Sequence, residues 1–276
     1  MDMLEDSLQR ERILQQESNS GGFAKPIDWS LLQHRRHHPN LTIDVQDAAV
    51  LGPNRESRQR AIHKLYALQI ASGHVVDVGC DQAALRELVP GKYTGIDLYG
   101  DADIRFDLCS GSPIPLADGV ADFVACTDVL EHLNDPHFYC DELLRISRQW
   151  VLIALPNCWR DAWQSLRQGY PSYRNYGISP ERHNDMHRWF FSTEEALDFV
   201  LYRAARAGFS AQTVTHFKLP FNHGFVWRRP RKLLEKVIGR IHYESMRAAL
   251  TYMDTPNSRE WLNRHVSASW YLLRRT

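Results

Sequence analysis

The stretch His74-Val-Val-Asp-Val-Gly79 decides the fold, because a β-branched run that ends in a turn predicts a buried strand. Further runs have the composition of strands, and helical patterns separate most of them. The strand-like runs are 93–97, 103–108, 121–127, 150–155, 213–221 and 269–274; the helical patterns are 55–70, 83–89, one that begins at Asp135-Pro136 and one that begins at the capping box Ser192-Thr-Glu-Glu195. Strands that alternate with helices predict a doubly wound α/β fold with a seven-stranded, mostly parallel sheet.

The rest of the chain is expected to surround this core. Residues 1–22 are polar, end in Ser-Gly-Gly and predict a mobile tail. Residues 23–72 are expected to form an irregular N-terminal cap that ends in the helix 55–70. Residues 73–276 are expected to form the main domain, with a helical insertion at about 222–265 before the last strand.

Composition limits the class of protein. The 276 residues are 43% hydrophobic and carry 33 basic and 33 acidic side chains, so no net charge draws the chain toward nucleic acid or anionic lipid. No apolar run approaches the roughly 20 residues of a membrane-spanning helix, and the N-terminus lacks an apolar signal core. The five cysteines are widely spaced and form no C-x-x-C pair. A protein of the reducing cytoplasm, without a disulfide framework or a cysteine zinc site, is expected.

Two carboxylates mark the ligand-binding edge of the predicted sheet. Asp77 and Gly79 lie where the first strand turns toward its helix, and Asp97 ends the second strand. Ligands of doubly wound sheets bind beyond the carboxyl ends of the strands, where an acidic side chain can accept hydrogen bonds from ribose hydroxyls. A nucleoside ligand is therefore expected. The sequence lacks G-x-G-x-x-G after the first strand, which disfavours a dinucleotide-dependent dehydrogenase. It also lacks a P-loop, which disfavours a nucleoside triphosphatase of that type.

These residues resemble class I S-adenosylmethionine-dependent methyltransferases, especially the small-molecule enzymes of the type 11 and type 23 groups. The resemblance covers about 75–191 and is carried by Asp77-x-Gly79, Asp97, Phe106-Asp-Leu108, Pro115-Leu-Ala-Asp-Gly119 and the run from Ala121-Asp-Phe-Val to Asp128-Val-Leu-Glu-His-Leu133. It implies a Rossmann-like methyltransferase fold and S-adenosylmethionine as cofactor. The implied cofactor contacts are Asp77, Gly79 and Cys80 at the methionine end, Asp97 and Leu98 at the ribose, Asp107 and Leu108 at the adenine, and Asp128 close by.

The chain departs from that family in the loop after the first strand. The family usually carries further glycines where this chain has Asp81 and Ala83. Two outcomes are open. Either Asp81 faces the ammonium group of the cofactor, or the loop is distorted and binding is weak.

A second group of polar residues follows the strand 121–127. Asp128, Glu131 and His132 have the spacing D-x-x-E-H, which puts them on one face if a helical turn begins there. Such a face can bind a divalent cation or supply a base with its orienting partner. The group resembles the metal set of some O-methyltransferases, among them enzymes of ubiquinone biosynthesis and of small-RNA 2′-O-methylation, and this implies that His187 completes it. The alternative, that Glu131 caps a helix and His132 packs beside the cofactor, stays open.

The acceptor is expected to face the segment 156–191, because loops beyond the fifth strand usually do so in this fold. This segment is rich in aromatic and basic side chains: Trp159, Arg160, Trp163, Tyr170, Tyr173, Arg174, Tyr176 and Trp189. Some of them can equally be packing residues. Residues 227–241 combine a basic run with an apolar helical stripe, which is typical of core or homodimer packing. The alternatives are a peripheral membrane helix and a binding surface for a phosphorylated or nucleic acid acceptor.

The expected activity is transfer of a methyl group to a hydroxyl of a small-molecule or glycan-type acceptor. His132 or His187 is expected to be the general base, with Glu131 beside it. Two alternatives remain: a metal-dependent RNA 2′-O-methyltransferase, which would bind RNA in a salt-sensitive manner, and a non-catalytic binding module on the same fold.

Overall fold

The computed structural model describes residues 41–52, 54–71, 73–167, 175–176, 186–218 and 266–276. All of them belong to the unit His34–Thr276 of the chain. The expected tail 1–22, the first part of the expected cap and the insertion 222–265 lie outside these residues. Within the described part of the chain, no helix combines the length and the apolar character needed to cross a membrane.

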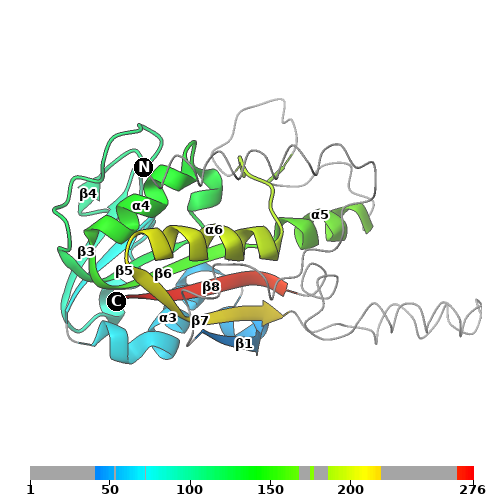
Figure 1. Ribbon diagram of the computed structural model, residues 1–276, viewed down its shortest axis with the longest axis horizontal. Coiled ribbons are helices and arrows are strands. Elements are labelled where there is room, and N and C mark those ends of the chain that lie inside the picture. The colour runs from blue at the N-terminus through cyan, green and yellow to red at the C-terminus, as the bar shows by residue number, and fades with distance from the viewer. Residues whose placement is uncertain (1–40, 53, 72, 168–174, 177–185, 219–265) are drawn as a thin grey trace, which may run out of the picture. The chain divides into compact units, whose positions relative to one another are not determined.

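An eight-stranded sheet forms the centre of the fold, in the order β1-β7-β8-β6-β5-β2-β3-β4 (Figure 1). β8 is antiparallel to both of its neighbours, β6 and β7, and every other pair is parallel. The strands are β1 (Thr42–Asp47), β2 (His74–Val78), β3 (Lys92–Asp97), β4 (Ile104–Arg105), β5 (Ala121–Thr127), β6 (Ser147–Pro156), β7 (Phe209–Lys218) and β8 (Val266–Arg275). The predicted mostly parallel α/β sheet is confirmed.

Helices cover both faces of this sheet. They are α3 (Arg55–Ile70), α4 (Pro136–Ile146), α5 (Cys158–Arg167) and α6 (Thr193–Arg206), with short 3₁₀ turns η2 (Ala48–Leu51), η3 (Arg86–Leu88) and η4 (Leu130–His132). Val124 of β5 packs in one apolar cluster with Leu143 of α4, whereas its neighbour Phe123 packs in the other with Ile62 of α3. Successive residues of the central strands thus face opposite sides, and burial on both sides explains why β5 is almost wholly apolar.

N-terminal capping residues determine where the two helices α4 and α6 begin. The Asp135 side chain accepts a hydrogen bond from the Phe138 N–H at 2.9 Å, with Pro136 as the first residue of α4. α6 begins with a reciprocal capping box between Ser192 and Glu195. Both starts agree with the sequence expectation.

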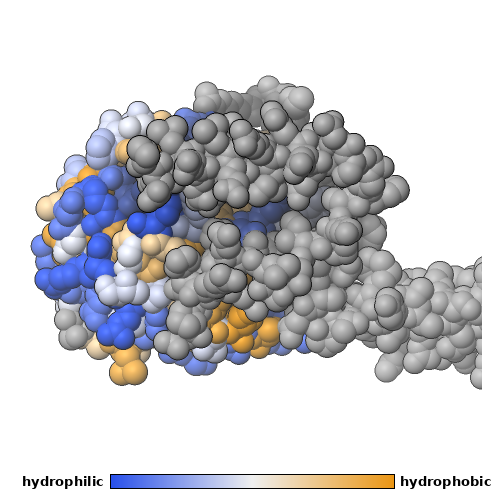
Figure 2. Space-filling model, in the orientation of Figure 1, coloured by the Kyte–Doolittle hydropathy of each residue, from blue (hydrophilic) through white to orange (hydrophobic). Residues whose placement is uncertain are grey.

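The sheet has eight strands, so the predicted count of seven is wrong. The additional strand, β1, comes from the segment expected to be an irregular cap, and it pairs with β7 from Thr42↔Thr213 to Asp47↔Lys218. Ile43 and Val45 are exposed on this edge strand, and apolar surface is visible at that position in Figure 2. None of the six residues of β1 is buried, because an edge strand has a neighbour on one side only, so its sequence lacks the buried apolar run that marks the central strands.

Two other predicted elements are shorter than expected. Residues 83–89 form turns and the 3₁₀ segment η3 instead of an α-helix, since Ala83 has a left-handed φ of 51° that interrupts a helix there. The strand expected at 103–108 is limited to the two residues of β4. Its chain leaves the sheet edge after Arg105, where the Phe106 N–H donates to the Asp97 carbonyl.

Candidate active site

The loop after β2 keeps a glycine-type backbone although two of its residues are not glycine. Gly79, Asp81 and Ala83 have φ values of 80°, 50° and 51°. The Asp81 N–H donates to Asp97 Oδ2 at 2.9 Å, and the Asp81 carbonyl accepts from the Asp101 N–H at 2.7 Å. These bonds hold Asp81 in the left-handed region, which is less costly for Asp than for most residues. The loop therefore keeps left-handed conformations at both positions where glycine was expected.

A cavity of about 480 Å³ adjoins this loop. The predicted cofactor residues Gly79, Cys80, Asp81 and Asp128 line it. The other predicted cofactor residues do not line it. These are Asp77, Asp97, Leu98, Asp107 and Leu108. Its volume lies in the range of about 300–1,000 Å³ that is typical of ligand sites.

The two key carboxylates occupy different environments. Asp77 is buried and accepts the Tyr93 hydroxyl at 3.0 Å, and its burial raises its pKa to about 7. Asp97 is half-buried at the end of β3 and accepts backbone N–H groups from Asp81 and, at 3.2 Å, from Tyr99. Each carboxylate oxygen can accept more than one hydrogen bond, so Asp97 retains acceptor capacity toward a ribose.

Farther along, Asp107 and Leu108 follow β4. Asp107 accepts the Cys109 N–H at 2.7 Å, and Leu108 is buried in the core. Leu98 is exposed beyond β3, and Cys80 is buried, which raises the pKa of its thiol to about 12. Cys80 is therefore a packing residue without thiolate character.

Helix α3 supplies cavity residues that the sequence analysis did not identify. Arg55 lies 3.4 Å from the Asp81 carboxylate, and Arg58 pairs with the carboxylate of Asp128. Both arginines line the cavity. Asp81 thus faces an arginine of its own chain, and two cations stand where a ligand carboxylate could be bound. The only signal in the sequence was the presence of arginines in a helix that precedes the first strand.

Asp128 does not share a face with Glu131 and His132, contrary to the expectation from their spacing. Its φ is 56°, and the 3₁₀ turn η4 begins two residues later, at Leu130. Asp128 therefore points toward Arg58 and the cofactor cavity. Among the described residues, Glu131, His132 and His187 have ligand atoms that all lie within 4.8 Å of one another, and Asp128 is not a member of this group. The structure thus does not bring Asp128 together with the other three residues of the expected metal set.

The segment 186–191 brings His187 to this cluster, because several hydrogen bonds attach it to η4. The Arg188 N–H donates to the Glu131 carbonyl at 2.8 Å, and the Arg188 Nε donates to the His132 carbonyl at 2.7 Å. The Trp189 indole donates to the Leu133 carbonyl at 2.8 Å. These contacts join residues more than fifty positions apart, which is why spacing alone could not show the cluster.

Hydrogen bonds also orient the two imidazoles. His132 Nδ1 lies 3.1 Å from the Met186 carbonyl, which can only accept, so Nδ1 carries the proton and Nε2 of the neutral ring has a free lone pair. The Tyr176 hydroxyl lies 2.7 Å from His187 Nδ1. The rings of His132 and His187 meet edge to face, with centroids 4.7 Å apart.

Glu131 is the unusual member of the cluster. It is buried, and its Oε2 has no hydrogen-bond partner within the described residues. Burial, together with the nearby charge of Asp128, raises its pKa well above the usual value. A buried carboxyl oxygen without a partner is costly, so this atom is a natural contact for a proton donor or a cation.

Comparison with known proteins identifies the type of domain that carries this site. Residues 76–154 match the sequence model of a family described as a methyltransferase domain. The sequence of this segment is therefore that of a methyltransferase domain. The matched segment runs from β2 through η4 to β6, so it contains Asp77, Gly79, Asp97 and the Glu131–His132 pair. No curated protein sequence matches this chain.

The chain is also similar to solved structures at low sequence identity. A SAM-dependent methyltransferase from Archaeoglobus fulgidus is 18% identical, with a TM-score of 0.50, and the match covers 80% of this chain and 95% of that one. The small RNA methyltransferase HEN1 is 14% identical, with a TM-score of 0.48, over 79% of this chain and 25% of that one. The chain thus spans only about a quarter of HEN1. A putative methyltransferase from Bacillus halodurans is 12% identical, with a TM-score of 0.44, over 78% and 97% of the two chains.

Proposed function

We propose that this methyltransferase transfers a methyl group from S-adenosylmethionine to a hydroxyl oxygen of a small-molecule acceptor, with His132 as the general base. The observation that carries the proposal is the hydrogen bond from His132 Nδ1 to the Met186 carbonyl, which makes Nε2 the proton-accepting nitrogen of an imidazole that lies close to Glu131 and His187. In the transfer, the acceptor O–H proton passes to this nitrogen. The acceptor oxygen forms a bond to the methyl carbon as the carbon–sulfur bond breaks, which releases S-adenosylhomocysteine.

The cofactor is proposed to occupy the cavity beside the 79–83 loop. Asp97 would accept hydrogen bonds from the ribose, and the left-handed backbone at Gly79 would allow close approach of the methionine portion. Arg55 and Arg58 would offer cations to its carboxylate. Both polar ends of the cofactor would then have partners in the chain.

Glu131, His132 and His187 also suit a divalent cation. A buried carboxylate and two imidazoles are ligands that Zn²⁺ and Mn²⁺ accept, and the Oε2 atom that lacks a partner is the observation in favour. A cation bound there would lower the pKa of the acceptor hydroxyl. We propose this cation as an optional component of the site. When no cation is bound, His132 serves as the general base.

The cofactor part is tested by calorimetric titration with S-adenosylhomocysteine. We expect micromolar binding to the wild type and a loss of roughly 30-fold or more in Asp97→Ala, since hydrogen bonds to a charged group contribute about 1.5–3 kcal/mol each. Asp101→Ala is the matched control, because its side chain is exposed, whereas that of Asp97 accepts the Asp81 N–H of the cofactor loop. Equal affinity in both variants would contradict the assignment of Asp97.

The base is tested by transfer of radiolabelled methyl groups to a panel of hydroxylated compounds. His132→Ala is expected to bind S-adenosylhomocysteine normally and to lose transfer by about 10²–10⁴-fold, whereas His63→Ala on α3 should transfer normally. Undiminished turnover in His132→Ala would refute the role of His132. Calorimetry with MnCl₂ and ZnCl₂ tests the cation, whose binding heat should disappear in Glu131→Gln.

A further inference from the structure

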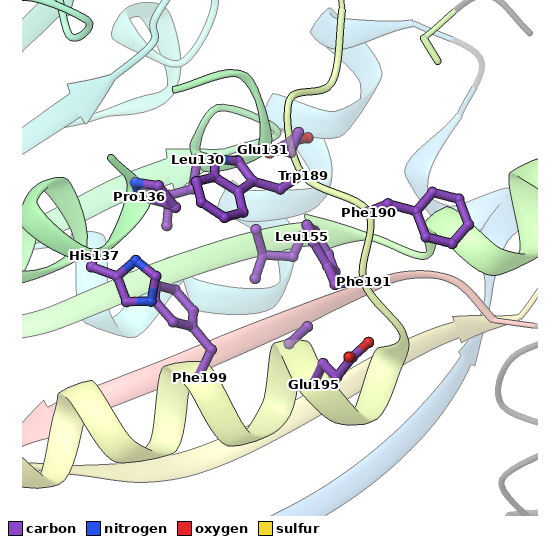
Figure 3. A pocket seen from close by; sticks show the side chains of 11 residues that line it. Leu130, Glu131, Pro136, His137, Leu155, Trp189, Phe190, Phe191, Glu195 and Phe199 are labelled. Atoms are coloured by element: carbon purple, nitrogen blue, oxygen red, sulfur yellow. The ribbon is translucent and has the colours of Figure 1, made fainter. Parts of the chain in front are cut away.

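A second cavity of about 250 Å³ lies on the other side of the Asp128–Glu131 turn. It is bounded by η4, the first turns of α4 and α6, the end of β6 and the segment 189–191 (Figure 3). Leu130, Leu155, Phe191 and Phe199 line it, and the half-exposed ring of Trp189 lies beside them. The wall is therefore mainly apolar and aromatic.

Glu131 borders this cavity and is its only deeply buried ionisable group among the described residues. The other two, His137 and Glu195, are exposed at its rim. Figure 3 shows Glu131 at one end of the cavity and His137 with Phe199 at the other. A ligand here would have its apolar body among the aromatic rings and one polar group beside Glu131.

One turn of the chain contributes lining residues to both cavities. Asp128 lines the cofactor cavity and Glu131, three residues later, lines the apolar one. His132 follows directly, so the proposed base lies beside the polar end of the apolar cavity. A hydroxyl at Glu131 would thus lie close to the proposed base.

We propose that this apolar cavity binds the acceptor, and that the acceptor is a phenol-type compound of one or two rings. This rests on the proposed function and adds the substrate class to it. Aromatic rings pack favourably against the lining, whereas the several hydroxyls of a sugar would lose their hydrogen bonds to water without replacement. A phenolic hydroxyl, with a pKa near that of tyrosine, about 10, also gives up its proton to an imidazole more readily than an aliphatic alcohol does.

The test measures binding, so it does not depend on turnover. Wild-type protein saturated with S-adenosylhomocysteine is titrated calorimetrically with 2-naphthol and, separately, with methyl α-D-glucopyranoside. We expect 2-naphthol to bind with a Kd below about 1 mM and the glucoside not to bind. Ala196→Leu, which adds volume inside the cavity, should weaken 2-naphthol binding by about 10-fold or more. Ala205→Leu on the same helix does not line the cavity and should have no effect.

A second measurement keeps the proposal testable if Ala196→Leu fails to fold. Nuclear Overhauser effects from bound 2-naphthol to the methyl groups of Leu130 and Leu155 are expected in the wild type. Absence of 2-naphthol binding, equal affinity in Ala196→Leu, contacts elsewhere, or binding of the glucoside instead would each overturn the proposal. If S-adenosylhomocysteine itself fails to bind, the proposed function fails; if it binds and 2-naphthol does not, only this inference fails.

Discussion

Gly79 and Gly111 share a left-handed backbone, with φ values of 80° and 75°, but differ in their surroundings. A Cβ at Gly79 would overlap a methyl group of Val129, whereas a Cβ at Gly111 would meet nothing within 4 Å. Gly111→Ala should therefore cost only the backbone term of about 1–2 kcal/mol. Gly79→Ala should cost about 1 kcal/mol more and weaken S-adenosylhomocysteine binding, because Val129 and the loop must shift. Chemical denaturation measures the free energy of unfolding, and calorimetry measures the affinity for S-adenosylhomocysteine. Equal losses of unfolding free energy in the two variants would contradict the steric argument.

Asp77 makes stability depend on pH in a defined direction. Its pKa is about 7 in the folded protein because of burial, against about 3.9 in an unfolded chain. Between these values the folded state binds more protons than the unfolded state, so the contribution of Asp77 to the free energy of unfolding falls as pH rises from about 4 to 7. Above pH 7 this contribution is constant.

Asp77→Asn tests that dependence. Asparagine has nearly the same shape and can still accept the Tyr93 hydroxyl, but it has no charge to bury. We expect the variant to unfold at a higher temperature than the wild type at pH 8, by roughly 2–4 °C per kcal/mol gained, and to differ little at pH 4. Calorimetric melts at both pH values measure this. A variant that is less stable at pH 8 would show that the charge of Asp77 is compensated in the folded state.

At the scale of elements, the capping box of α6 both starts the helix and shapes the apolar cavity. The Ser192 hydroxyl accepts the Glu195 N–H at 3.1 Å, and the Glu195 carboxylate accepts the Ser192 N–H at 2.7 Å. Ser192→Ala should lower the free energy of unfolding by about 1 kcal/mol. Ser112→Ala, at an exposed turn, is the control and should change little. Urea titrations of both variants give the comparison, and equal stability would mean that packing alone starts α6.

At the scale of the whole molecule, the cofactor cavity draws on α3, the loop after β2 and the end of β5, and leaves the β1–β7 side of the sheet uninvolved. S-Adenosylhomocysteine is therefore expected to slow amide hydrogen exchange at about 54–60, 79–84 and 127–129, and not in β1 or β7. Hydrogen-exchange mass spectrometry provides the measurement. The protection should be absent in Asp97→Ala, and protection centred on β1 would refute the location of the site.

The sequence determined the features that depend on neighbouring residues. Apolar runs predicted β2, β5 and β6, and caps predicted the starts of α4 and α6, because periodicity and N-cap hydrogen bonds are local. The order of the acidic residues along successive strands predicted a ligand at the carboxyl edge of a parallel sheet. The resemblance of these motifs to those of known methyltransferases indicated the type of domain.

Only the tertiary structure decided which side chains meet. Asp128 leaves the cluster because its backbone is left-handed and Arg58, seventy residues earlier, pairs with it. His187 joins Glu131 because hydrogen bonds attach segment 186–191 to η4, and the edge strand β1 exists through its pairing with β7. Each outcome depends on contacts between residues far apart in the chain. Their free energy arises only when the sheet has formed, so spacing along the sequence could not reveal them.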